Sequence, residues 1–397
     1  MRISFSDLSV SAATAGFVAV LVGFTSSVAI VFQAATALGA TPAQLSSWMW
    51  ALGLGMGLCS LVPSLWWRQP VMVAWSTPGA AVLATAGAHG AFGMAEATGA
   101  FIVCAALITL VGATGWFERV LVRIPLPIAS ALLAGVLTRF ALDMIQAVEL
   151  APAMVLGMVA AYLIGRRGWP RYAVPGVLLV GVLQALAVGQ LHVADVPWSL
   201  TTPVFTAPQF SWAGTVSLAL PLFVVTMASQ NLPGVAAIRA AGYSMPISKI
   251  ITLTGLTTLV LAPFGAFALN LSAITASICM GREAHPDAGR RYMAAASCGA
   301  IYCVVGLWGG TVAGLLAAFP HALVVAIAGL ALLGSIGGGL SVALQDAAHR
   351  EAALITFLVT LSGIHLGGIG AAFWGVVAGG LARFVQQWRA RPVEGNP

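Results

Sequence analysis

The sequence has very few charged side chains. Only 17 Lys and Arg and 11 Asp and Glu occur among 397 residues, or 7% of the chain, whereas 60% of the residues are hydrophobic. Soluble globular domains carry about 25% charged residues, so this composition excludes a soluble protein. We therefore expect a polytopic membrane protein embedded in the lipid bilayer.

The apolar segments also lack the side chains that enzymes and metal sites need. They contain no HExxH motif and no paired carboxylates, and the five cysteines lie in apolar runs without CxxC spacing. We therefore expect no catalytic residue, no metal site and no cofactor. The N-terminus, MRISFSDLSVS, lacks the features of a cleavable signal, so the first span is expected to be retained.

Hydrophobic runs of spanning length are frequent. With roughly 20 apolar residues per span, the chain contains about fourteen segments. A polar, proline-rich stretch at 191–211 divides them into two sets of seven, and an odd number inverts the second set relative to the first. The expected boundaries are 12–35, 46–66, 70–89, 94–117, 125–146, 150–165, 172–190, 212–232, 247–262, 264–281, 288–318, 320–343, 350–364 and 368–388.

Basic residues fall on one side of this arrangement. If the N-terminus is cytoplasmic, every Lys and Arg except Arg139 lies in a cytoplasmic loop or tail, as the positive-inside rule expects. This pattern predicts cytoplasmic N- and C-termini. It also explains the net charge of +6 without a nucleic-acid partner.

The third segment, 69–89, has the pattern of an interrupted helix. An extended run from Pro70 to Trp75 is followed by Ser76, Thr77 and Pro78, which is typical of a helix N-cap with proline in the first turn. A helix is expected to start near Pro78, halfway through the span. Such an N-terminus within the membrane suits an anion. The alternative is a proline-kinked spanning helix with only a packing role.

The tenth segment repeats this pattern at 263–280. When Pro70 is aligned with Pro263, Thr77 falls on Asn270, so each half-helix is expected to begin at a capping residue. Interrupted helices at matching positions in the two halves indicate a transporter built from inverted repeats.

Other polar residues lie within spans. Span eight contains Ser229, Gln230 and Asn231. The two amide side chains must form hydrogen bonds with a neighbouring helix, with water in a cavity or with a ligand.

Span five contains a possible ion pair. Arg139 and Asp143 share a helix face and could pair, either as a functional pair or as an interfacial pair near the helix end.

Three stretches resemble a known family: PVMVAWSTPGAA, SQNLPGVAAIRAAGY and ALNLSAITASICMGREAHPDAGRRY. The chain resembles the benzoate/proton symporters of the BenE family, bacterial inner-membrane carriers related in fold to the uracil/proton symporter and to sulfate-permease type carriers. The resemblance implies an all-α membrane protein with spans 3 and 10 broken into a short strand and a half-helix. It also implies a core domain formed by 1–120 and 196–318, and a gate domain formed by 121–195 and 319–397.

The resemblance implies a secondary active transporter that imports benzoate, or a similar aromatic carboxylate, with protons by alternating access. Asp143 and His365 are the candidates for proton coupling. The nucleobase carriers have carboxylates in spans eight and ten, whereas this chain has amides and hydroxyls there, as an anion site would require. The expected substrate-binding residues are Ser26, Trp75, Ser76, Thr77, Gln230, Asn231, Asn270, Leu271 and Ser272.

The sequence is also compatible with other functions. One is a carrier or exchanger for another small anion or a nucleobase-like substrate, although Trp75 and the apolar surroundings favour an aromatic ligand. A membrane-embedded enzyme or an ion channel is a more remote alternative. Relatives of this fold are often dimers, so a homodimer is a further expectation.

Overall fold

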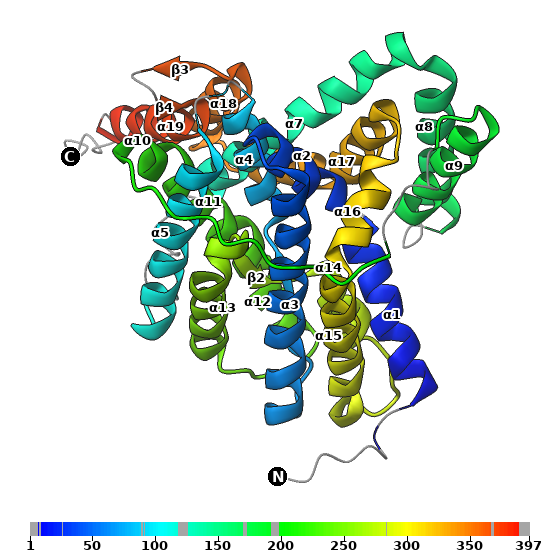
Figure 1. Cartoon of the computed structure of the whole chain (residues 1–397). Coiled ribbons are helices and arrows are strands. Elements are labelled where there is room, and N and C mark those ends of the chain that lie inside the picture. The colour runs from blue at the N-terminus through cyan, green and yellow to red at the C-terminus, as the bar shows by residue number, and fades with distance from the viewer. Residues whose placement is uncertain are drawn as a thin grey trace.

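The structure is a computed structural model of the whole chain. It describes residues 7, 9–25, 27–88, 90, 92–117, 126–169, 173–191, 198–282, 284–366 and 369–388. Almost all regular structure in these ranges is helical (Figure 1).

The first half runs through α1 (Val10–Thr25), α2 (Val28–Ala37), α3 (Pro42–Trp67), strand β1 (Val73–Trp75), α4 (Thr77–Gly87) and α5 (Met94–Ala113). It continues through α7 (Leu126–Leu150), α8 (Pro152–Gly168) and α9 (Ala173–Ala187). The α3 helix begins at a capping box, in which Thr41 and Gln44 bond reciprocally.

The second half begins with α10 (Trp212–Gly214), the π-helical turn η5 (Thr215–Ala219), α11 (Leu220–Thr226), the π-helical turn η6 (Met227–Asn231) and α12 (Leu232–Ala240). Then follow α13 (Ile247–Leu261), the 3-10 turn η7 (Ala262–Phe264), β2 (Leu269–Leu271), α14 (Ile274–Met280) and the 3-10 turn η8 (Ala288–Arg290). The chain ends with α15 (Tyr292–Leu307), α16 (Gly309–Ala317), α17 (His321–Gln345), α18 (Arg350–Ser362), the hairpin β3 (His365–Leu366) and β4 (Ile369–Gly370), and α19 (Ala371–Trp388).

Many of these helices can cross a membrane. Within the described ranges, seven helices are long and apolar enough, or eight if α15 and α16, bent by 75°, form one span. The helices α8, α9 and α18 have 17, 15 and 13 residues and are shorter than a typical span. The expected polytopic helical membrane protein is therefore confirmed, whereas the number fourteen stays a prediction.

The helices pack into two groups. Helix α3 packs on α15 and α13, α2 on α4, α5 on α13, and α1 on α14 and α15. In the other group, α7 packs on α17 and α18, α18 on α19, and α8 on α9. The groups meet where α7 contacts α4 and η6, and where α17 contacts α2. We call this boundary the seam.

An extended segment connects the two halves. Residues 198–211, within the predicted divider, cross in front of α3 in Figure 1. The Val204 N–H donates to Ser47 Oγ at 2.9 Å, and the Thr201 N–H donates to the Leu307 carbonyl at 2.9 Å. The segment therefore ties α3 to α15 from outside.

Candidate functional site

The two interrupted segments meet as a pair of antiparallel strands. In β1 and β2, Val73 pairs with Leu271, Ala74 with Asn270 and Trp75 with Leu269. The Ser76 N–H donates to the Ala268 carbonyl at 3.1 Å, and the Ser272 N–H donates to the Met72 carbonyl at 3.0 Å, which extends the ladder at both ends. Because these bonds satisfy the extended backbone, the non-helical segments can lie buried within the protein. The expected strand plus half-helix is therefore present in both segments.

The first half-helix begins where the sequence predicts. Ser76 is the N-cap of α4, and its Oγ accepts a hydrogen bond from the Gly79 N–H at 3.1 Å. The Thr226 hydroxyl of α11 donates to the same Oγ at 2.8 Å. Thr77 and Pro78 occupy the first turn. The predicted start near Pro78 is confirmed, although the cap is Ser76 and not Thr77.

The second half-helix begins later than predicted. Asn270 lies in the middle of β2, and α14 starts only at Ile274. The Ser272 Oγ accepts from the Thr275 N–H at 3.3 Å, as Ser76 does from Gly79. The structural counterpart of Ser76 is thus Ser272, an offset of 272 − 76 = 196 residues, and not the 270 − 77 = 193 that the aligned prolines gave.

The later start of α14 has a local cause in the turn that precedes β2. Pro263 lies inside the 3-10 turn η7, which ends at Gly265 with φ = 106°. Pro70, in contrast, leads directly into extended chain. The additional turn uses residues that the alignment of prolines assigned to the strand, so the alignment was wrong as a guide to the cap.

Several predicted site residues lie buried in the strand joint. Trp75 is 3% exposed, donates from Nε1 to Ser27 Oγ at 2.7 Å, and packs on Phe24 with the ring centroids 5.4 Å apart. Asn231 is fully buried, and its Oδ1 accepts from the Leu271 N–H at 2.9 Å. These bonds connect η6 and the start of α2 to the strands, so the residues fix the relative positions of the broken segments.

Asn270 is also fully buried. Its Nδ2 donates to the Ala268 carbonyl at 3.2 Å, whereas its Oδ1 has no hydrogen-bond partner among the described atoms. Leaving such an acceptor unpaired costs about 1–3 kcal/mol.

A cavity of about 600 Å³ opens in front of this joint, within the seam. We call it the seam cavity. Both half-helix starts reach it, at Thr77 and Pro78 of α4 and at Ile274 of α14, together with the π-helical turn η6. Turns of this kind inside helices are frequent at functional sites. The opposite wall comes from α7 and α17, and the described lining comprises Ser27, Thr77, Pro78, Leu126, Ser130, Leu133, Leu137, Ala228, Ser229, Gln230, Leu232, Pro233, Ile274, Ala331, Leu332, Gly338, Gly339 and Val342.

The seam cavity contains only part of the predicted site. Thr77 and Gln230 line it, whereas the other described members of the predicted set belong to the buried joint behind it. Ser26 lies outside the described residues, but its neighbour Ser27 lines the cavity. The side chain of His365, at the start of β3, also lies outside the described part.

The α7 wall was missing from the predicted site residues. Leu126, Ser130, Leu133 and Leu137 recur every three or four residues, which places them on one helix face. This spacing was visible in the sequence. However, it does not say which partner the face meets, so it could not identify a cavity wall.

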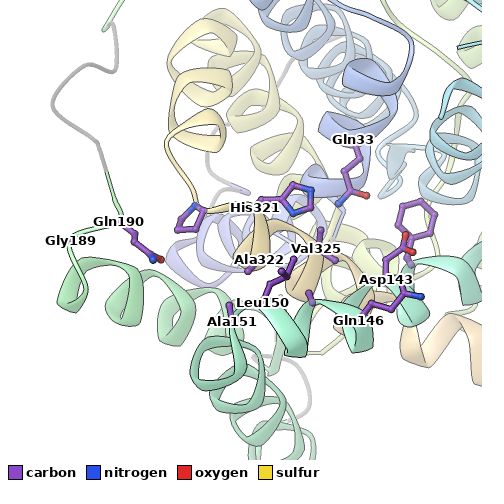
Figure 2. A pocket seen from close by; sticks show the side chains of 13 residues that line it. Gln33, Asp143, Gln146, Leu150, Ala151, Gly189, Gln190, His321, Ala322 and Val325 are labelled. Carbon is purple, nitrogen blue, oxygen red and sulfur yellow. The ribbon is translucent and has the colours of Figure 1, made fainter. Parts of the chain in front are cut away.

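A second cavity, of about 820 Å³, lies toward the other ends of α7 and α17 (Figure 2). Asp143 and Gln146 of α7, His321 of α17 and Gln33 of α2 line it. Among the described residues, Asp143 forms no salt bridge with Arg139. The Arg139 guanidinium lies instead beside Gly363, the residue that follows α18, since a Cβ atom added to Gly363 would lie 3.1 Å from Arg139 Nη1.

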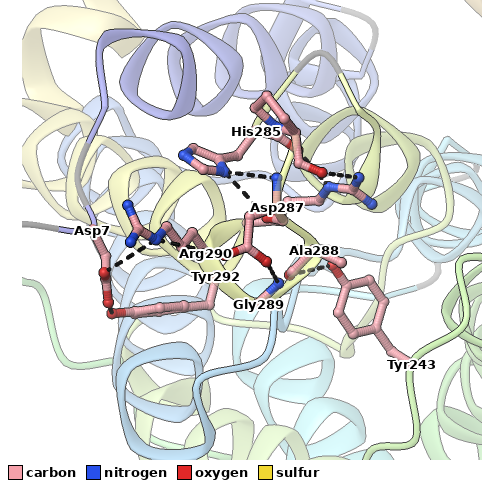
Figure 3. A network of polar contacts seen from close by, with 10 residues as sticks. Asp7, Tyr243, His285, Asp287, Ala288, Gly289, Arg290 and Tyr292 are labelled. Atoms are coloured by element: carbon pink, nitrogen blue, oxygen red, sulfur yellow. Dashed lines mark hydrogen bonds and ion pairs between the residues drawn. The ribbon is translucent and has the colours of Figure 1, made fainter.

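A polar network holds the far end of α14 (Figure 3). Arg291 is 8% exposed and donates to the carbonyls of Met280, His285 and Pro286 at 2.9, 2.8 and 3.3 Å. Tyr292 donates to Asp7 at 2.8 Å. A cation at a helix C-terminus is favourable, so Arg291 fixes the half-helix from its end. From the sequence alone, Arg291 was expected only to be one of the basic residues in the cytoplasmic loops.

Comparisons with known proteins show which family this chain is similar to. The family described as benzoate membrane transport protein matches residues 6–385. The inner membrane protein YdcO of Escherichia coli (strain K12) is 48% identical over 371 residues, which cover 94% of each chain. The benzoate membrane transport protein of Acinetobacter baylyi (strain ATCC 33305 / BD413 / ADP1) is 39% identical over 379 residues, which cover 96% of each chain.

A solved structure is similar in fold. The transmembrane domain of the cyanobacterial bicarbonate transporter BicA aligns with a TM-score of 0.57 at 14% identity, over 97% of this chain and 98% of that one. Such low identity supports the fold alone. The sequence relatives and the family match establish more, and this chain therefore belongs to the family of benzoate membrane transport proteins, as a membrane transporter and not an enzyme.

Proposed function

We propose that this chain is a secondary active transporter that imports benzoate, or a similar aromatic carboxylate, together with protons by alternating access. The observation that carries this proposal is the seam cavity, where both half-helix starts face an apolar wall. Small-molecule sites are typically apolar cavities with a few polar groups that fix orientation. Membership of the benzoate transport family supports the choice of substrate.

The two sides of the cavity suit the two ends of an aromatic carboxylate. Leu133 and Leu137 of α7, with Leu332 of α17, offer apolar surface to the ring. On the other side, the Thr77 hydroxyl and the Gln230 amide can donate to the carboxylate at the positive end of the α4 dipole. The remaining members of the predicted set would act indirectly, by holding α4 and η6 in place.

The expected architecture belongs to the same proposal. Fourteen spans in two inverted repeats would explain why β1 and β2 pair antiparallel and why Ser76 and Ser272 accept equivalent bonds. We propose the core domain at 1–120 and 196–318, and the gate domain at 121–195 and 319–397. The distribution of Arg residues supports cytoplasmic termini, and the E. coli relative supports a bacterial inner membrane location. A homodimer remains part of the proposal.

Uptake of labelled benzoate into proteoliposomes under an inward proton gradient tests this function. The variants are Thr77→Val and Gln230→Ala, with Thr114→Val as the control, because Thr114 is exposed and its hydroxyl bonds within its own helix end. A hydrogen bond to a charged group is worth about 1.5–3 kcal/mol, so each site variant should raise KM at least about tenfold.

The controls decide how a negative result is understood. Thr114→Val should transport like the wild type. Unchanged KM in both site variants would move the substrate away from the seam cavity. Absence of benzoate uptake by the wild type would favour a different small anion or a nucleobase-like substrate, and competition by those compounds can be measured in the same vesicles.

A further inference from the structure

The second cavity brings an acid and a base together from two helices. Asp143 lies toward the end of α7, and His321 is the first residue of α17. Figure 2 shows both side chains at the cavity, with Gln33 of α2 and Gln146 of α7 beside them. Because Gln33 comes from the other helix group, this cavity also lies on the seam.

The two cavities lie in series along the same helices. On α7, the lining passes from Leu133 and Leu137 at the seam cavity to Phe140 and Asp143 at the second cavity. Steps of three or four residues keep all of them on one helix face.

A packed contact lies between the cavities. A Cβ atom added to Gly329 of α17 would lie 2.6 Å from Met144 Cβ and 2.9 Å from the Phe140 carbonyl oxygen. Helices α7 and α17 therefore approach each other closely at this point. Helix α2 packs on α17, and it supplies Gln33 to the second cavity while its N-cap, Ser27, lines the seam cavity. A change in how α2 packs on α17 would therefore alter both cavities.

The second cavity contains one side chain that can accept a proton and one that carries a carboxylate. The imidazole of a histidine is a common proton carrier in proteins. The charged groups that face Asp143 are His321 from α17 and Arg139 from its own helix, and both act on the carboxylate electrostatically. The described polar groups from other elements, Gln33 of α2 and Gln190 after α9, are neutral amides.

We infer that Asp143 and His321 together bind the coupling proton, at a site separate from the substrate. This inference rests on the proposed symport function. The imidazole takes up one proton from the aqueous side of the membrane, and the summed charge of Asp143 and His321 changes from −1 to 0. Arg139, whose guanidinium lies beside Gly363 and outside the described lining of the cavity, keeps its charge in both states. When the seam closes there, a pair with net charge loses more hydration energy than a neutral pair. Closure is therefore favoured only after the proton has bound, which couples proton binding to the conformational change.

The test separates proton-driven accumulation from exchange. Proteoliposomes with His321→Gln, Asp143→Asn or the control Glu149→Gln are measured for labelled benzoate accumulation under a pH gradient, and for benzoate exchange at equal pH. Glu149 is an exposed carboxylate on the same helix outside the described lining. A gradient of one pH unit supports at most about tenfold accumulation per coupled proton, because the proton activities on the two sides differ tenfold, which corresponds to about 1.4 kcal/mol.

Loss of proton-driven accumulation in both site variants, with exchange at equal pH retained, supports the inference. The Glu149 variant should accumulate benzoate like the wild type. Accumulation at the wild-type level in either site variant overturns the inference, and so does a parallel loss of accumulation and exchange in correctly folded protein. Failure of the wild type itself to take up benzoate would instead contradict the proposed function.

Discussion

At the scale of single residues, the polar and aromatic side chains around the strand joint mainly bond to one another. Trp75 bonds to Ser27, Asn231 to the backbone of Leu271, and Thr226 to Ser76. A buried donor or acceptor must be paired in a low-dielectric interior. A polar residue within a span is therefore a sign of broken helices, but it need not touch the substrate.

Trp75 offers a test of this distinction. Trp75→Phe keeps an aromatic ring beside Phe24 but removes the Nε1–H donor to Ser27. Loss of one buried hydrogen bond costs about 1–3 kcal/mol, so we expect a lower melting temperature in detergent and a KM for benzoate within about twofold of the wild type. A large rise in KM at an unchanged melting temperature would instead show that the ring contacts the substrate.

At the scale of elements, the broken helices could be predicted because their signals are local. A hydroxyl residue before Thr77 and Pro78 indicates a helix start whatever surrounds it. The register of the second strand could not be predicted in this way. It depends on the turn at Gly265 and on the backbone bonds to β1, which join residues far apart in the sequence.

The turn at Gly265 leads to a second prediction. With φ = 106° it favours glycine, and an added Cβ atom would overlap Trp48, whose ring packs on Phe101 and Phe267. Gly265→Ala should therefore cost more than the roughly 1 kcal/mol that an unfavourable backbone conformation alone costs. The measurement is the melting temperature in detergent together with benzoate uptake.

Gly242→Ala is the matched control. Gly242 also has a positive φ, of 81°, but no other atom would lie within 4 Å of an added Cβ. Its melting temperature should fall less than that of Gly265→Ala, and its uptake should stay normal. Equal losses in the two variants would show that close packing under the strand joint contributes nothing to the position of β2.

At the scale of the whole molecule, the seam between the two helix groups contains both the seam cavity and the second cavity. The composition predicted a membrane protein because burial in lipid depends on average polarity. It could not predict how α7 and α17 meet α4 and η6, since an apolar helix face packs equally well on lipid or protein. The residues of the seam on α7 and α17 therefore emerge only from the three-dimensional arrangement.

The most direct test of the central claim, that the substrate binds in the seam cavity, is protection of an introduced cysteine. Ser229→Cys, in η6, is labelled with a maleimide in the presence and absence of benzoate, with Ser244→Cys as an exposed control outside the seam cavity. The wild type gives the background, because four of the five native cysteines are buried and Cys303 is partly buried.

At a benzoate concentration about tenfold above its dissociation constant, occupancy should slow the labelling of Ser229→Cys about tenfold and leave Ser244→Cys unaffected. An unchanged labelling rate at Ser229→Cys, in protein that still takes up benzoate, would contradict the account.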